Sequence, residues 1–184
     1  MSGGDDHSLT ERMGALRAQG IHSILTTFTD LHGVPKGKLV PLEALPDAVA
    51  TGAGFAGPSI WGTGLPRMGA RGEYFGRVVP ESLRPLPFMP GVAHAVCDGF
   101  AGGEPLETCS RQLLKHQLNR LRERGWTFHV GIEPEFFLMK QDPQGRWGVA
   151  DAQDQLDKPS YDLKAIQRNF GFLDDMRRHL TALG

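Results

Sequence analysis

The chain has 184 residues, of which 40% are hydrophobic and 22% charged, a composition that supports a packed core in one ordinary domain or two small ones. Lysine and arginine number 20 against 21 aspartates and glutamates, and this balance argues against nucleic acid as a partner. No apolar run approaches the ~18–20 residues that a membrane helix needs, and the polar N-terminus does not resemble a signal peptide. Two cysteines, Cys97 and Cys109, cannot build a disulfide framework, so we expect a reducing, cytoplasmic setting.

The first forty residues predict one helix followed by a hairpin. Apolar residues recur at helical spacing over 8–20, and Gly20 ends the run. Residues 21–29 and 34–40 have the apolar and β-branched composition that is typical of strands. The residues between them, 30–33, have turn chemistry, so the two strands are expected to form a hairpin.

Glycine and proline are concentrated between residues 51 and 103. Residues 52–71 predict an irregular loop, either one that lets a ligand approach its backbone or an ordinary mobile surface loop. A short helix over 42–49 and strands over 75–79 and 93–98 complete this part of the chain. Short strands combined with few helices predict an α+β fold.

The sequence changes character near residue 105, where helix formers replace glycine and proline. Residues 108–124 predict the clearest helix, with leucines on one face and basic residues largely elsewhere. A long strand is expected over 126–139, followed by a turn at 142–145 and a last helix over 162–183.

The expected strand over 126–139 carries the residues with the clearest chemistry. Because side chains alternate along a strand, Glu133 and Glu135 would share one face, with Cα atoms ~6.6 Å apart at ~3.3 Å per residue. Carboxylates that close repel each other unless one is protonated or a cation lies between them, and oxygen ligands suit Mg²⁺ or Mn²⁺. The alternative is a solvated strand face, although the apolar Phe137 and Met139 on the same face argue against it.

Residues 131–138, Gly-Ile-Glu-Pro-Glu-Phe-Phe-Leu, resemble the metal-binding strand of the glutamine synthetase family, whose pattern is Gly-x-Glu-x-Glu-Phe-Phe-Leu. Other segments resemble parts of that family in the same order along the chain. With the family feature that each segment resembles in parentheses, they are 28–41 (the N-terminal hairpin), 55–60 (the Gly-Ser-Ser loop), 86–98 (the strand that closes the N-terminal domain) and 108–124 (the first helix of the catalytic domain). In addition, Pro80-Glu81 lies where the family has a Pro-Asp pair.

The resemblance implies an α+β fold in two parts and an oligomer. Residues 1–20 would be an N-terminal helix or extension, 21–103 a β-grasp-like domain, and 104–184 the beginning of the glutamine synthetase catalytic α+β domain. Members of the family are much longer, so the rest of the catalytic domain is expected to be missing from this chain. The family forms homo-oligomeric rings in which one subunit's N-terminal domain completes the next subunit's site.

The reaction implied by the resemblance is an ATP-dependent ligation. It joins the γ-carboxylate of glutamate to ammonia or an amine through γ-glutamyl phosphate. Glu133 resembles the ligand of the metal on the ATP phosphates, and Glu135 resembles the ligand of the metal near glutamate and the nucleophile. Mg²⁺ or Mn²⁺ would offset the charge that develops during phosphoryl transfer. Neither a nucleic acid nor a membrane partner is implied.

The segment that resembles the Gly-Ser-Ser loop departs from the family pattern. Gly57 and Ser59 are the candidate substrate-loop residues, whereas Ala56 stands where ammonia-using members carry an aspartate, and Pro58 replaces the first serine. A methyl group cannot accept a proton, so no catalytic residue is assigned. The loop is similar to that of the divergent, type III-labelled branch, for which amines are candidate nucleophiles beside ammonia.

Three functions are compatible with these residues. The first is a glutamine synthetase-type ligase whose isolated chain is inactive, because two carboxylates are too few ligands for Mg²⁺. The second is a non-catalytic fragment that binds or regulates full-length subunits. The third, a small β-grasp binding module with an incidental Glu-Pro-Glu, does not explain why the segments match in order.

Overall fold

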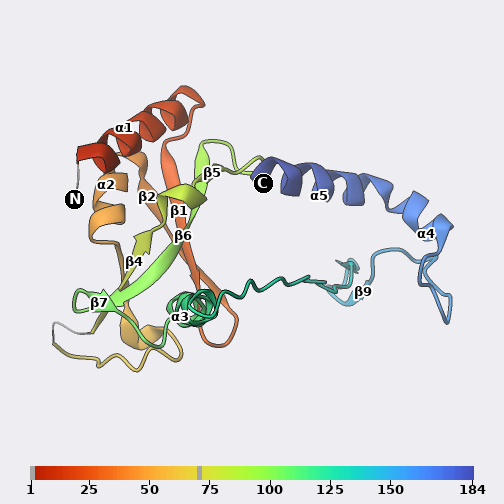
Figure 1. The fold of residues 1–184 in the computed structure, drawn as a ribbon. Helices are drawn as coiled ribbons and strands as arrows, with labels where there is room; N and C mark the ends of the chain where they lie inside the picture. The colour runs from red at the N-terminus through yellow and green to blue at the C-terminus, as the bar shows by residue number, and fades with distance from the viewer. Residues whose placement is uncertain (1–2, 70–71) are drawn as a thin grey trace. The chain divides into compact units, whose positions relative to one another are not determined.

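The computed structural model describes residues 3–69 and 72–184, which belong to two compact units. The first unit extends to Phe128, and the second runs from His129 to Ala182. Figure 1 shows a sheet with helices in the first unit and a small hairpin with helices in the second. The domain boundary expected at 103/104 stays a prediction.

A mixed β-sheet forms the centre of the first unit. Its strands are β1 (Ser23–Thr29), β2 (Pro35–Pro41), β3 (Ala53–Ala56), β4 (Glu73–Val78), β5 (Arg84–Pro85), β6 (Val92–Ala101) and β7 (Glu104–Pro105). The main path runs β2-β1-β6-β4-β3, with β1 and β6 parallel and the other neighbours antiparallel. Strands and helices thus combine as expected for an α+β fold, whereas the β-grasp assignment stays a prediction.

The predicted hairpin is confirmed, and its turn is organised by one carboxylate. Asp30 accepts hydrogen bonds from the backbone N–H groups of His32 at 2.9 Å and Val34 at 3.0 Å. Burial alone would raise the pKa of Asp30, but these N–H groups and the nearby Lys36 ammonium outweigh it and lower the pKa. Gly33 completes the turn with a φ of 78°, a conformation that suits glycine.

Two helices share one buried core with the sheet. Helix α1 (Gly3–Ala18) confirms the helix predicted over 8–20, although it begins earlier, and α2 (Leu45–Ala50) follows the 3-10 turn η1 (Leu42–Ala44). After α1, the N–H of Ile21 donates to the carbonyl of Leu16 at 3.0 Å, which closes the helix end. The core cluster comprises Leu16, Ile21, Ile24, Leu42, Leu45, Ala48, Val78, Leu83, Ala93, Ala95 and Cys97.

The expectation of a loop throughout 52–71 is wrong at its start, where β3 pairs antiparallel with β4. Phe55 on β3 packs edge-on against Phe28 of β1, with ring centroids 5.0 Å apart. This aromatic contact buries apolar surface and so stabilises β3 as a strand. The high glycine content of the stretch gave no indication of it. The backbone leaves the sheet at the 3-10 turn η2 (Gly57–Ser59), and a third such turn, η3 (Pro80–Ser82), follows β4.

Helix α3 (Ser110–Arg122) confirms the helix predicted over 108–124 and closes the first unit. Gly125, with a φ of 70°, follows its C-terminus, as predicted from the glycine at this position.

The strand predicted over 126–139 is wrong for residues 127–138. They form no strand, and every side chain from 127 to 138 is exposed. Regular pairing begins only at β8 (Met139–Gln141), which forms an antiparallel hairpin with β9 (Trp147–Val149) around the predicted turn at 142–145. A strand is held by hydrogen bonds to a neighbouring strand, and residues 127–137 have no such neighbour in the described part of the chain. The carbonyl of Leu138 accepts from the N–H of Ala150 at 2.9 Å, where the hairpin begins.

Two helices end the second unit, where a single helix was expected over 162–183. They are α4 (Leu163–Arg168) and α5 (Phe170–Leu183), separated at Asn169, whose ψ of 10° lies outside the helical range. The carbonyl of Ala165 accepts from both the backbone N–H of Asn169 at 3.1 Å and its side-chain amide at 2.9 Å. None of the helices in the described residues is both long and apolar enough to cross a bilayer.

Candidate functional site

Glu133 and Glu135 lie in the exposed, unpaired segment of the second unit. Their neighbours are exposed as well: 82% of Ile132 and 91% of Phe137 are accessible to solvent. The prediction that one face of this segment is buried is therefore wrong for the described chain, whereas the role of the two glutamates as metal ligands stays a prediction.

The donor chemistry of Glu133 and Glu135 fits a divalent cation, but the donors are too few to complete a site. Carboxylate oxygens are preferred by Mg²⁺ and Mn²⁺, and Mg²⁺ takes about six ligands in octahedral geometry. Within residues 3–69 and 72–184, no three His, Cys, Asp or Glu side chains gather closely enough to hold a metal ion. A metal here would take its other ligands from water, from substrates or from residues outside that part of the chain.

The candidate substrate loop lies in the first unit and is built tightly around glycine. The N–H of Gly57 donates to the carbonyl of Gly72 at 3.0 Å. A Cβ atom on Gly57 would lie 2.5 Å from Leu65 Cδ1 and 2.7 Å from Gly72 O, so only glycine fits there. The predicted loop residue Gly57 therefore has a structural reason to be glycine, separate from any contact with substrate.

Ala56, Pro58 and Ser59 are exposed around this buried glycine. They line an open hollow of about 640 Å³, together with Arg67, Gly69, Gly72 and Glu73. Ala56 and Glu73 are register partners at the edge of the sheet. The hollow therefore offers a methyl group, a hydroxyl and charges of both signs. The sequence analysis did not identify its two charged residues, Arg67 and Glu73, as part of a site.

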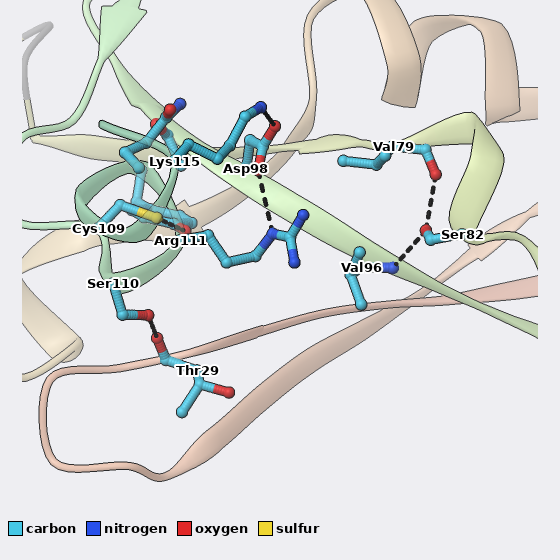
Figure 2. A network of polar contacts seen from close by, with 12 residues as sticks. Thr29, Val79, Ser82, Val96, Asp98, Cys109, Ser110, Arg111 and Lys115 are labelled. Carbon is cyan, nitrogen blue, oxygen red and sulfur yellow. Dashed lines mark hydrogen bonds and ion pairs between the residues drawn. The ribbon is translucent and has the colours of Figure 1, made fainter. Parts of the chain in front are cut away.

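Helix α3 is fixed to the sheet by a polar network that the sequence analysis did not find (Figure 2). Asp98 of β6 is only 8% exposed and pairs with Arg111 at 3.0 Å and with Lys115 at 2.6 Å. Ser110 at the helix start donates to the carbonyl of Thr29 at 2.8 Å. The spacing of Arg111 and Lys115 by one helical turn could have suggested a shared acidic partner.

The two cysteines are free and buried. Burial raises the pKa of the Cys97 thiol to about 12, so it is protonated at neutral pH. Cys109 Sγ lies 3.8 Å from the hydroxyl of Tyr74, whose pKa is raised mainly by burial and further by Cys109. Both thiols are therefore part of the packed interior of the first unit.

Comparisons with known proteins connect these observations. The family model described as "Glutamine synthetase, catalytic domain" matches residues 107–184. The chain is 39% identical over 178 residues to the glutamate–methylamine ligase of Methyloversatilis universalis. This alignment covers 96% of the present chain and 40% of that ligase. The chain is 32% identical over 168 residues to the glutamine synthetase of Rhizobium meliloti, covering 91% of this chain and 37% of that protein. The chain belongs to the glutamine synthetase family.

Solved structures of family members agree with the sequence relatives. The structure titled "GmaS/ADP complex-Conformation 1" matches with a TM-score of 0.76 and 31% identity, covering 94% of this chain and 39% of that one. "Apo GmaS without ligand" matches with a TM-score of 0.77 and 30% identity over the same shares. The chain thus spans about 40% of the length of the glutamine synthetase relatives that it matches.

Proposed function

We propose that the protein containing these residues is an ATP-dependent ligase that joins the γ-carboxylate of glutamate to ammonia or an amine through γ-glutamyl phosphate. The observation that carries the proposal is the 39% identity to a glutamate–methylamine ligase over 96% of the chain. That share includes the Gly-Ile-Glu-Pro-Glu-Phe-Phe-Leu segment and the loop around Gly57. The ADP complex of a similar structure supports nucleotide use.

The roles proposed for Glu133 and Glu135 follow from their carboxylate chemistry. Glu133 would hold Mg²⁺ or Mn²⁺ at the ATP phosphates, and Glu135 would hold a second ion beside glutamate and the nucleophile. The bound ions would offset the negative charge that gathers in phosphoryl transfer. Both side chains are exposed in an extended segment, which leaves them accessible to ions and substrates.

We propose a small amine rather than ammonia as the preferred nucleophile. Ammonia and small amines are both mainly cations at neutral pH and must each lose a proton, so the absence of an acidic side chain at position 56 does not by itself distinguish them. The loop offers the methyl group of Ala56 and the ring of Pro58 on the rim of the hollow, and such apolar groups favour contact with the alkyl group of an amine, which ammonia lacks. The relative with 39% identity is named for methylamine, which agrees with this choice.

The test uses the protein as its gene encodes it, assayed for ADP release with ATP, glutamate and Mg²⁺ or Mn²⁺. We expect turnover with methylamine that exceeds turnover with ammonia, and a shift toward ammonia in Ala56→Asp. Glu133→Gln and Glu135→Gln should each abolish turnover, whereas Glu123→Gln, an exposed residue after α3, should not. A wild-type protein that releases no ADP with any nucleophile would refute the ligase assignment.

We further propose that a polypeptide of residues 1–184 alone does not turn over ATP, and that it acts only as part of a larger or oligomeric site. The observation in favour is that the described residues bring no three metal-binding side chains together. ADP release by that polypeptide with glutamate and an amine would contradict this. The homo-oligomer implied by the family is part of the same proposal, and sedimentation of the protein as encoded tests it.

A further inference from the structure

The candidate substrate loop is closed by one buried threonine. Thr63 is 8% exposed, and its single hydroxyl proton is shared between two carbonyl oxygens, that of Gly57 at 2.8 Å and that of Ile60 at 3.2 Å. The hydroxyl oxygen accepts from the N–H of Leu65 at 3.4 Å. One side chain thus satisfies backbone groups at both ends of the turn that carries Pro58.

A second threonine connects this closed loop to α3. The hydroxyl of Thr108, just before that helix, donates to the carbonyl of Thr63 at 3.1 Å. The start of α3 is in turn held by Ser110 on the carbonyl of Thr29 and by the ion pairs of Asp98. The loop is therefore attached to an element that is itself anchored to the sheet.

The exposed side of the loop is the side that lines the hollow. Ala56, Pro58 and Ser59 are exposed there, while Gly57 and Thr63 are buried beneath them. Movement of the carbonyl of Gly57 would shift the neighbouring Ala56 and Pro58 with it, because they are joined through planar peptide bonds. The hydroxyl of Thr63 does not line the hollow, but through the carbonyl of Gly57 it fixes the positions of Ala56 and Pro58, which do.

We propose that Thr63 is a positioning residue that holds the loop over Ala56–Ser59 in the conformation that receives the amine nucleophile. This inference rests on the proposed function, which assigns the loop to the nucleophile. Loss of the hydroxyl removes one of the two donors to the carbonyl of Gly57, which also accepts from the N–H of Ile60 at 3.1 Å, and leaves the N–H of Leu65 without this acceptor. Thr63→Val keeps the shape of the side chain and removes only these bonds, and Thr63→Ser restores them.

The kinetic test uses the protein as its gene encodes it. Thr63→Val should raise the KM for the amine about tenfold while the KM for ATP stays unchanged, since one buried hydrogen-bonding group is lost at the loop alone. Thr63→Ser should recover the wild-type KM for the amine. Thr51→Val, an exposed threonine in the same unit, is the matched control and should change neither KM.

A second measurement separates this inference from the proposed function. Amide hydrogen exchange in Thr63→Val should be faster at Ile60 and Leu65 and unchanged at Ile24 in the sheet. If the wild-type protein has no ligase activity, the proposed function and the role in amine binding both fall, and exchange still decides whether Thr63 closes the loop. An unchanged amine KM in an active Thr63→Val protein, or equal losses in both KM values without rescue by serine, would overturn the positioning role alone.

Discussion

Substitution of Gly99 tests how closely Tyr74 of β4 packs against β6. Gly99 lies on β6, where it is the register partner of Gly76 on β4. A Cβ atom on Gly99 would lie 2.6 Å from the hydroxyl oxygen of Tyr74 and 2.7 Å from its Cε2 atom. Real Cβ atoms do not approach so closely, so Gly99→Ala requires the tyrosine ring to move.

The ring of Tyr74 has little room to move. It is 2% exposed, and its centroid lies 4.4 Å from that of Phe28 and 6.0 Å from that of Phe55. Overpacking of such a core lowers the free energy of unfolding by roughly 1–3 kcal/mol. Because Gly99→Ala displaces a large buried ring, we expect a loss near the upper end, about 3 kcal/mol. For a domain of this size, that loss lowers the Tm by roughly 10 °C.

Thermal and urea unfolding followed by circular dichroism measure this loss. The matched control is Gly14→Ala in the exposed face of α1, where a Cβ atom meets nothing within 4 Å. Removal of a glycine from a helix interior should stabilise the protein by about 0.5–1 kcal/mol. If Gly99→Ala unfolds at the wild-type temperature, the close approach of Tyr74 to β6 is refuted.

The other predictions concern charge and titration. Because the folded protein holds the pKa of Cys97 at about 12, above its ordinary value of 9.0, unfolded chains lose this proton first as the pH rises. Stability should therefore fall between about pH 9 and pH 12, by up to about 1.4 kcal/mol per pH unit for this group, and less steeply in Cys97→Ala. The pKa of Asp30 is lowered, so its contribution is present above its ordinary value of 3.8 and is lost as the pH falls through the folded value; Asp30→Asn should flatten acid unfolding curves. Asp98→Asn should cost about 1–2 kcal/mol in urea unfolding, a modest value because Arg111 and Lys115 are partly exposed, and the loss should shrink at high salt.

Elements that depend on nearby residues were predicted well from the sequence. Helix α1 and its glycine stop, the first hairpin with its turn at Asp30, and α3 are each specified by side chains within a few positions of one another. The break at Asn169 was missed because the apolar spacing continues through it, while the backbone of this one residue, with φ -102° and ψ 10°, leaves the helical conformation. Local patterns therefore predicted which elements exist better than where they end.

The candidate site was predicted from motif resemblance and not from spatial proximity. Glu133, Glu135, Gly57 and Ser59 were identified because their segments resemble those of the family. The bond from Thr108 to the carbonyl of Thr63 joins residues 45 positions apart, and no periodicity or spacing connects two such threonines. Contacts of this kind depend on the folded path of the chain, so they become visible only in the structure.

The strand expected around Glu133 failed for a general reason. Alternation of apolar and acidic residues decides which side chains would share a face, but a strand exists only when its backbone N–H and C=O groups find a neighbouring strand. Met139 has such a neighbour because the turn at 142–145 brings Val149 opposite to it, and strand structure begins there. The same pattern in residues 127–137 meets no backbone partner in the described chain, so it does not produce a strand there. Alternation of apolar and acidic residues around Glu133 is therefore not sufficient for a strand, because backbone pairing decides whether two carboxylates are held on one face.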